Sequence, residues 1–152
     1  MALTRTEAQE QILGDLQSAI EALDLAVACL GEAYEHLDEE SQDRLDATLF
    51  RPIQKAYGQA KKTQDRFAKQ TGATTLDPEP AAPGLASQGA QSFIEQAVDA
   101  AANADSSVAD LQDSMLPIEF GDPELRQALA NIREPLAGVP TAAREFLRTL
   151  GR

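Results

Sequence analysis

Tryptophan is absent from this sequence, and aromatic residues make up only 5% of it. A core without large rings has to be filled by Leu, Ile, Val and Ala, which favours helices over strands. The single cysteine, Cys29, excludes an internal disulfide, and the single histidine, His36, excludes mechanisms that need two. Cys-x-x-Cys pairs, Gly-rich phosphate loops and nucleophile elbows are also missing. We therefore expect a protein that is not an enzyme and that uses no cofactor or metal.

Long apolar runs are missing as well. No run approaches the ~18 residues that a membrane-spanning helix needs. The first residues lack the basic start and apolar core of a signal peptide. The hydrophobic fraction of 43% and the charged fraction of 25% are ordinary for a soluble globular domain. We expect a cytoplasmic protein with a single helical domain over residues 1–152.

Apolar residues repeat in steps of three and four near the start of the chain. The repeat consists of Leu13, Leu16, Ile20, Leu23, Val27, Leu30, Tyr34 and Leu37. This spacing keeps an apolar residue on one face of a helix. Beside it runs a second line of Ile12, Ala19, Ala26 and Ala33. The wide apolar face is typical of a helix in a globular bundle, more than of a two-stranded coiled coil.

Similar repeats and capping signals predict three further helices. The expected bounds are about 4–37, 41–71, 87–116 and 122–150, with a Pro-rich linker over 72–86. Pro52 predicts a kink near Phe50, and Pro135 with Pro140 predicts a bend in the last helix. The predicted fold is an all-α, up-and-down antiparallel four-helix bundle with a long linker between helices 2 and 3 and a kinked helix 4.

The charges of these segments alternate in sign, and this pattern favours the up-and-down order. Residues 1–50 carry two Arg and twelve acidic residues, and residues 51–69 carry six basic residues and one Asp. Residues 86–124 carry eight acidic residues and no Lys or Arg, and residues 125–152 carry five Arg and two Glu. In an up-and-down bundle every helix would lie beside helices of opposite charge. Single surface pairs contribute only about 0–1 kcal/mol, but the pattern as a whole would favour this topology.

The second helix carries all the lysines of the protein, so it is the leading candidate for a partner contact. One interpretation is structural: these lysines complement the charge of the acidic neighbouring helices. The other is functional: they bind an acidic patch on a partner protein. The net charge of −12 argues against nucleic acid. The predicted contact residues are Leu25, Lys55, Lys61, Lys62, Arg66 and Lys69.

The predicted function is a non-catalytic interaction or scaffold/adaptor protein that acts through helix faces. Protein partners or self-association are expected. The alternative is a bundle that binds or senses a small apolar ligand, because Ala97, Ala101 and Ala104 could leave a cavity beside the third helix. Cys29 and His36 are interpreted as structural residues, since they stand too far apart on one helix to share a metal ion.

Overall fold

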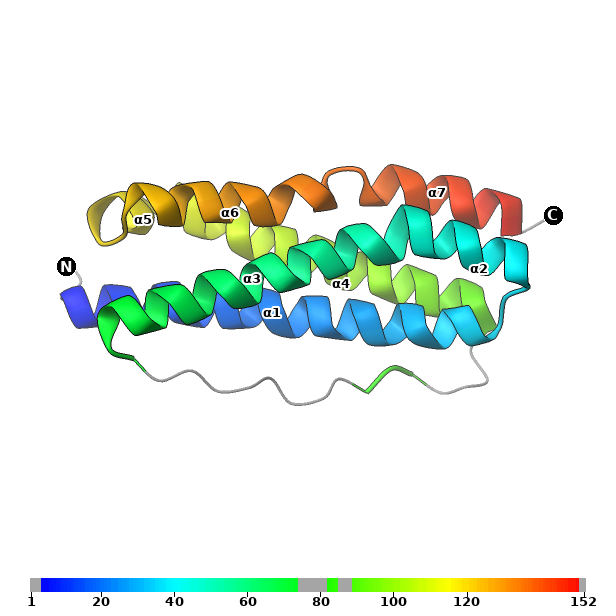
Figure 1. Cartoon of the computed structure of the whole chain (residues 1–152), viewed down its shortest axis with the longest axis horizontal. Helices are drawn as coiled ribbons and strands as arrows, with labels where there is room; N and C mark the ends of the chain where they lie inside the picture. Colours follow the sequence, from blue (N-terminus) through cyan, green and yellow to red (C-terminus); the bar gives the residue numbers. More distant parts are fainter. Residues whose placement is uncertain (1–3, 74–81, 85–88, 151–152) are drawn as a thin grey trace.

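The computed structural model describes residues 4–73, 82–84 and 89–150, and every regular element within these ranges is helical (Figure 1). The all-α prediction is confirmed for this part of the chain. The bounds are α1 (Arg5–Glu35), α2 (Glu39–Leu45), η1 (Asp46–Phe50), α3 (Arg51–Thr71), α4 (Gly89–Asp113), α5 (Leu116–Glu119), α6 (Pro123–Leu136) and α7 (Val139–Leu150). The segment 87–116 was expected to form one helix, but α4 ends at Asp113 and the short α5 follows it.

Side-chain caps determine where several helices begin. The Asp38 carboxylate accepts a hydrogen bond from the Ser41 amide at 2.7 Å and starts α2. This bond lowers the pKa of Asp38 below its ordinary value. The Asp122 carboxylate accepts from the Leu125 amide at 2.7 Å and starts α6. At the other end of α3, Gly72 adopts a left-handed conformation with φ 76°, which stops the helix.

The kink predicted near Phe50 takes the form of the π-helical turn η1. Proline has no amide hydrogen, so Pro52 cannot donate a bond to the preceding turn. The turn just before it is wider, and the Arg51 amide donates to the Asp46 carbonyl, five residues back. The wider turn accommodates the proline without ending the helix. As a result α2, η1 and α3 follow one another without a gap.

The last helical region is broken where the sequence predicts a bend. Pro135 lies inside α6, which ends at Leu136, and α7 starts at Val139. Leu136 and Val139 are both buried, so the apolar face continues across the break. Both parts pack on the same core.

The buried stripe of α1 is rotated relative to the predicted repeat. Tyr34, which belongs to that repeat, is 37% exposed, and Leu13 and Val27 are only half-buried. The fully buried residues of α1 are Ala8, Ile12, Leu16, Ala19, Leu23, Ala26, Cys29, Leu30 and Ala33, with Ile20 almost completely buried. The small residues therefore lie in the core and not at its edge.

The order of neighbours differs from the up-and-down prediction, which is wrong on this point. α1 makes its most extensive contact with α4 and a smaller one with α3, while α6 packs against α3 and α4. Among the described residues, α3 and α4 form no comparable contact, and neither do α1 and α6. Figure 1 shows the reason in the path of the chain, because α3 ends at one end of the molecule and α4 starts at the other.

α3 and α4 consequently run in the same direction on opposite sides of the core (Figure 1). The connection between them includes the predicted Pro-rich linker. Of that linker, residues 74–81 and 85–86 lie outside the described residues.

Candidate interaction surface on α3 and α6

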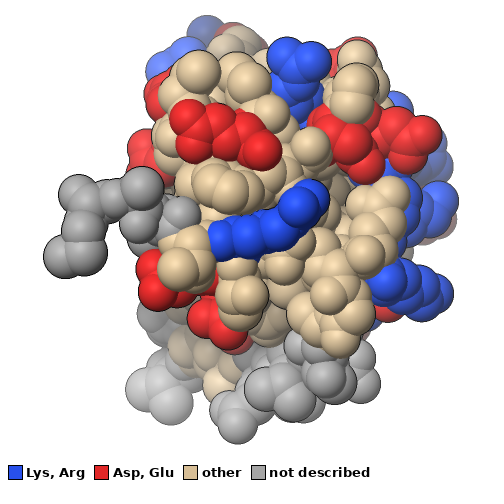
Figure 2. All heavy atoms as spheres, turned by 90° about the vertical axis from the view of Figure 1, so that its left-hand side faces the viewer, with Lys and Arg blue, Asp and Glu red and all other residues tan. Residues whose placement is uncertain are grey.

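The observed packing places the two most acidic helices, α1 and α4, side by side. α1 has Arg5 as its only basic residue and α4 has no Lys or Arg, and these two helices pack together. α3 carries six basic residues against Asp65, and it packs against α6, which adds Arg126 and Arg133. In an end view of the molecule, several Lys and Arg side chains gather along the right-hand edge (Figure 2). The surface is therefore divided into an acidic side, formed by α1 and α4, and a basic side centred on α3.

On the acidic side, the packing of α1 against α4 brings carboxylates close to one another, which is unfavourable. Burial raises the pKa of the Asp15 carboxyl above its ordinary value, and the nearby charge of Asp110 raises it further. Asp15 belongs to α1 and Asp110 to α4, so two carboxylates repel each other across the contact. At the opposite end of the same two helices, the His36 ring stacks on Phe93 with 6.0 Å between centroids. Both contacts fit an antiparallel alignment of α1 and α4.

Cys29 and His36 differ in accessibility, and His36 is exposed beside Phe93. Cys29 is fully buried, and burial together with the charge of Glu32 raises the pKa of its thiol. The thiolate that nucleophilic or redox chemistry needs is therefore disfavoured. In the part of the chain that the structure describes, no three His, Cys, Asp or Glu side chains cluster in a way that could hold a metal ion.

The predicted contact residues differ in how accessible they are. Lys55, Lys61, Lys62 and Lys69 are exposed. The Lys61 ammonium lies 5.3 Å from the centroid of the Tyr57 ring. The Lys69 ammonium forms a 3.1 Å ion pair with Asp65. Leu25 is half-buried and packs against the core, so only part of its side chain is available to a partner.

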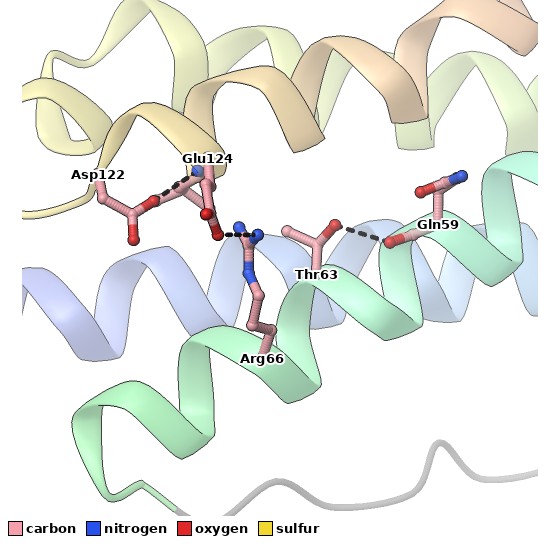
Figure 3. A network of polar contacts seen from close by, with 6 residues as sticks. Gln59, Thr63, Arg66, Asp122 and Glu124 are labelled. Carbon is pink, nitrogen blue, oxygen red and sulfur yellow. Dashed lines mark hydrogen bonds and ion pairs between the residues drawn. The ribbon is translucent and has the colours of Figure 1, made fainter.

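Two of these residues, Lys62 and Arg66, line a groove between α3 and α6. The groove has a volume of about 370 Å³. Its walls are formed by Gln59, Lys62, Thr63 and Arg66 of α3 and by Glu124, Gln127, Ala128 and Asn131 of α6. Figure 3 shows the Arg66 side chain reaching from α3 toward Glu124 on α6. We call this feature the α3/α6 groove.

An ion pair between Arg66 and Glu124 closes one end of the α3/α6 groove. The Nη1 atom of Arg66 donates to the Glu124 carboxylate at 2.7 Å. The Arg66 side chain is 37% exposed and that of Glu124 is 70% exposed. The Nε atom of Arg66 is buried and has no hydrogen-bond partner. Glu124 therefore satisfies only part of the hydrogen-bonding capacity of this guanidinium group.

The other polar side chains of the groove are held by local bonds. The Thr63 hydroxyl donates to the Gln59 carbonyl at 2.7 Å, as Figure 3 shows. On the opposite wall, the Gln127 amide donates to the Asn131 side-chain oxygen at 3.0 Å. These contacts within each helix fix the side chains in place. The amides keep further donors and acceptors that can face a ligand.

Sequence reasoning identified Lys62 and Arg66 but missed the groove and its α6 wall. A signal is present in the sequence, because every lining position except Ala128 is polar and the positions on both walls have the same helical spacing. Positions 59, 62, 63 and 66 and positions 124, 127, 128 and 131 each follow the steps of three, one and three that mark one helix face. A search for apolar repeats passes over this pattern.

A second hollow lies beside α4, near the break between α6 and α7. It has a volume of about 220 Å³, and its apolar lining includes Val98, Ala101 and Val139. Ala97 and Ala104 are fully buried and do not line it. The hollow is next to the alanines that predicted a cavity, but most of those alanines pack into the core.

Arg133 joins α6 to α4 beside this hollow. Its guanidinium group donates to the Asp105 carboxylate and to the Gln112 side-chain oxygen, both at 2.9 Å. The bond to Asp105 raises the pKa of Arg133. This cation is occupied by contacts within the protein, whereas Lys55 and Lys62 have no ion-pair partner within 4 Å among the described residues.

Comparison of the chain with protein-family models, with curated proteins and with solved structures finds no match. Within the described residues, none of the helices combines the length and the apolar character needed to cross a membrane.

Proposed function

We propose that this chain is a four-helix bundle with an end-to-end crossover, and that it acts as a non-catalytic, cytoplasmic interaction or scaffold protein. Its binding surface is the basic side of α3, and its partner is a protein with an acidic patch. The observation that carries the proposal is the separation of charge into an acidic α1/α4 side and a basic α3 side.

α3 has two neighbours of different charge. On the α1 side, Tyr57 beneath Lys61 donates to Asp24, and on the side of Lys62 the neighbour is α6, which has as many basic as acidic residues. Lys55, Lys61 and Lys62 are exposed, and none of them has an ion-pair partner within 4 Å among the described residues. An exposed group of like charges steers oppositely charged partners toward it.

The proposal is tested by affinity purification with a matched pair of double variants. Lys61→Glu/Lys62→Glu reverses two charges on α3, and Arg144→Glu/Arg148→Glu reverses two charges on α7. A specific partner is retained by the wild-type chain and the α7 variant, and it is lost from the α3 variant. Equal recovery with both variants would contradict a binding surface on α3.

A second function, binding of a small apolar ligand, has the hollow beside α4 in its favour. Val98, Ala101 and Val139 give it an apolar lining, and about 220 Å³ is room for only a small ligand. Native and denaturing mass spectrometry of one preparation separate the two functions. A native mass above an integer multiple of 16.3 kDa indicates a retained ligand. Loss of that extra mass in Ala101→Leu would place the ligand in this hollow.

A further inference from the structure

We infer that the α3/α6 groove binds an acidic side chain of a protein partner, and that Glu124 acts as an internal substitute for that side chain until the partner displaces it. This inference rests on the proposed function and narrows it from the whole basic side of α3 to one groove. Of the six predicted contact residues, only Lys62 and Arg66 belong to the groove.

The ligand chemistry follows from the group that occupies Arg66 now. A carboxylate, that of Glu124, lies 2.7 Å from its Nη1 atom. The buried Nε atom of the same guanidinium group has no partner. A guanidinium group can bind a carboxylate through two parallel hydrogen bonds, and Glu124 is recorded with one. The buried Nε atom is closed to a group from outside, but a partner carboxylate that bonds both Nη atoms makes one bond more than Glu124 does.

Displacing Glu124 costs little. Its side chain is 70% exposed, and exposed ion pairs contribute little to stability. When Glu124 swings away, water solvates its carboxylate. The ammonium group of Lys62, on the same wall of the groove, adds a second positive charge to the site. The pair thus behaves as a weak latch, which a partner carboxylate opens.

The size and lining of the groove favour a protein segment over a nucleic acid or a membrane. Its α3 wall runs from Gln59 to Arg66, about 10 Å along the helix axis. This length holds one or two side chains and not a long polyanion. The amides of Gln59, Gln127 and Asn131 can pair with a peptide backbone. The net charge of −12 repels extended phosphate backbones.

The inference is tested by fluorescence anisotropy with a labelled helix-forming peptide of Glu and Ala, about 15 residues long. An otherwise identical peptide of Gln and Ala measures the contribution of the carboxylates. The variants of the full chain are Glu124→Gln, Lys62→Gln and Arg66→Gln. Two matched controls change the same charges outside the groove: Lys55→Gln on α3 and Glu134→Gln on α6. Circular dichroism verifies that each variant is folded.

The latch predicts that substitutions of Glu124 and of its partner Arg66 change the affinity for the acidic peptide in opposite directions. Glu124→Gln frees Arg66 and should tighten binding of the acidic peptide about threefold, the size expected for one exposed pair. Lys62→Gln and Arg66→Gln should each weaken it about threefold or more. Lys55→Gln and Glu134→Gln should change the affinity for the acidic peptide by less than about half of that factor, which is about 1.5-fold. They act only through long-range charge.

Other outcomes contradict different parts of the argument. If Lys55→Gln weakens binding as much as Lys62→Gln, and Glu124→Gln behaves like Glu134→Gln, the groove is wrong but a basic binding side on α3 stands. If the acidic peptide binds no better than the Gln peptide, the proposed function fails as well. If phosphatidylserine vesicles or a single-stranded oligonucleotide bind more tightly and respond to the same groove variants, the occupant is not a protein side chain.

Discussion

The contact between α1 and α4 joins two acidic helices, whereas the contact between α3 and α6 joins a basic helix to one with as many basic as acidic residues. The two contacts are also built differently. At the first contact both helices bury small residues, including Ala19 and Ala26 of α1 and Ala97 and Ala104 of α4. The second leaves a polar groove of about 370 Å³ between the helices. The α1/α4 contact is closely packed, whereas the α3/α6 contact has an open groove lined by polar side chains.

This difference teaches that packing outweighs surface charge in choosing which helices meet. Burying one Leu or Ile side chain contributes about 1.5–3 kcal/mol, whereas an exposed ion pair contributes about 0–1 kcal/mol. A few additional buried side chains therefore offset the repulsion between acidic helices such as α1 and α4. The charges follow the packing, and they gather on separate sides of the molecule as a consequence.

The largest expected effect comes from emptying the α1/α4 contact. Phe93 of α4 is fully buried, so Phe93→Ala should lower the free energy of unfolding by about 3–5 kcal/mol. Urea denaturation followed by circular dichroism measures this loss. A loss below about 1 kcal/mol would mean that this contact is not a tightly packed one.

A smaller loss of stability is expected when a larger side chain is introduced into the same contact. The matching substitution in the α3/α6 groove is the control. Ala97 of α4 is fully buried, and Ala97→Leu should cost about 1–3 kcal/mol because the added atoms have no space. Ala128 is half-buried and lines the groove, so Ala128→Leu should cost less than about 0.5 kcal/mol. Urea midpoints of the two variants compare the contacts directly, and equal losses would remove the distinction between them.

Removing one of the facing carboxylates should stabilise the protein slightly. The pKa of Asp15 is raised in the folded state, so its ionised form destabilises the fold. Asp15→Asn should therefore raise the free energy of unfolding at pH 7, by less than about 1 kcal/mol. The gain should shrink as the pH falls through the raised pKa of Asp15, because the wild-type carboxyl then becomes protonated.

Thermal denaturation between pH 3 and pH 7 measures this trend, with Glu10→Gln on the same helix as a control that changes the same charge. Glu10 is exposed. A stabilisation by Asp15→Asn that does not depend on pH would argue against repulsion as its cause.

The smallest effect on stability is expected at the groove. Arg66→Gln removes the ion pair with Glu124, and the free energy of unfolding should change by about 0–0.5 kcal/mol. Thermal denaturation of the variant, beside Lys55→Gln, measures the change. A loss above about 2 kcal/mol would make this pair part of the architecture and contradict its description as a weak latch.

Much of the local structure could be predicted, but the candidate site could be predicted only in part. The caps at Asp38 and Asp122 and the breaks at Pro52 and Pro135 are encoded by neighbouring residues in the chain. Lys62 could be singled out by its charge. Glu124, its neighbour across the groove, could not, because the two residues meet only when α3 and α6 pack together.

By itself, the sequence determined the helices, since apolar spacing, capping side chains and prolines act over four or five residues. Only the tertiary structure decided which helices meet, because that choice depends on a sum over whole interfaces. The alternating charges favour placing α4 beside α3, and the buried alanines and leucines place it beside α1. The free energy gained by burying these apolar side chains is larger than that of the surface charges. Many apolar side chains leave water at once, while the exposed charges remain screened by the solvent.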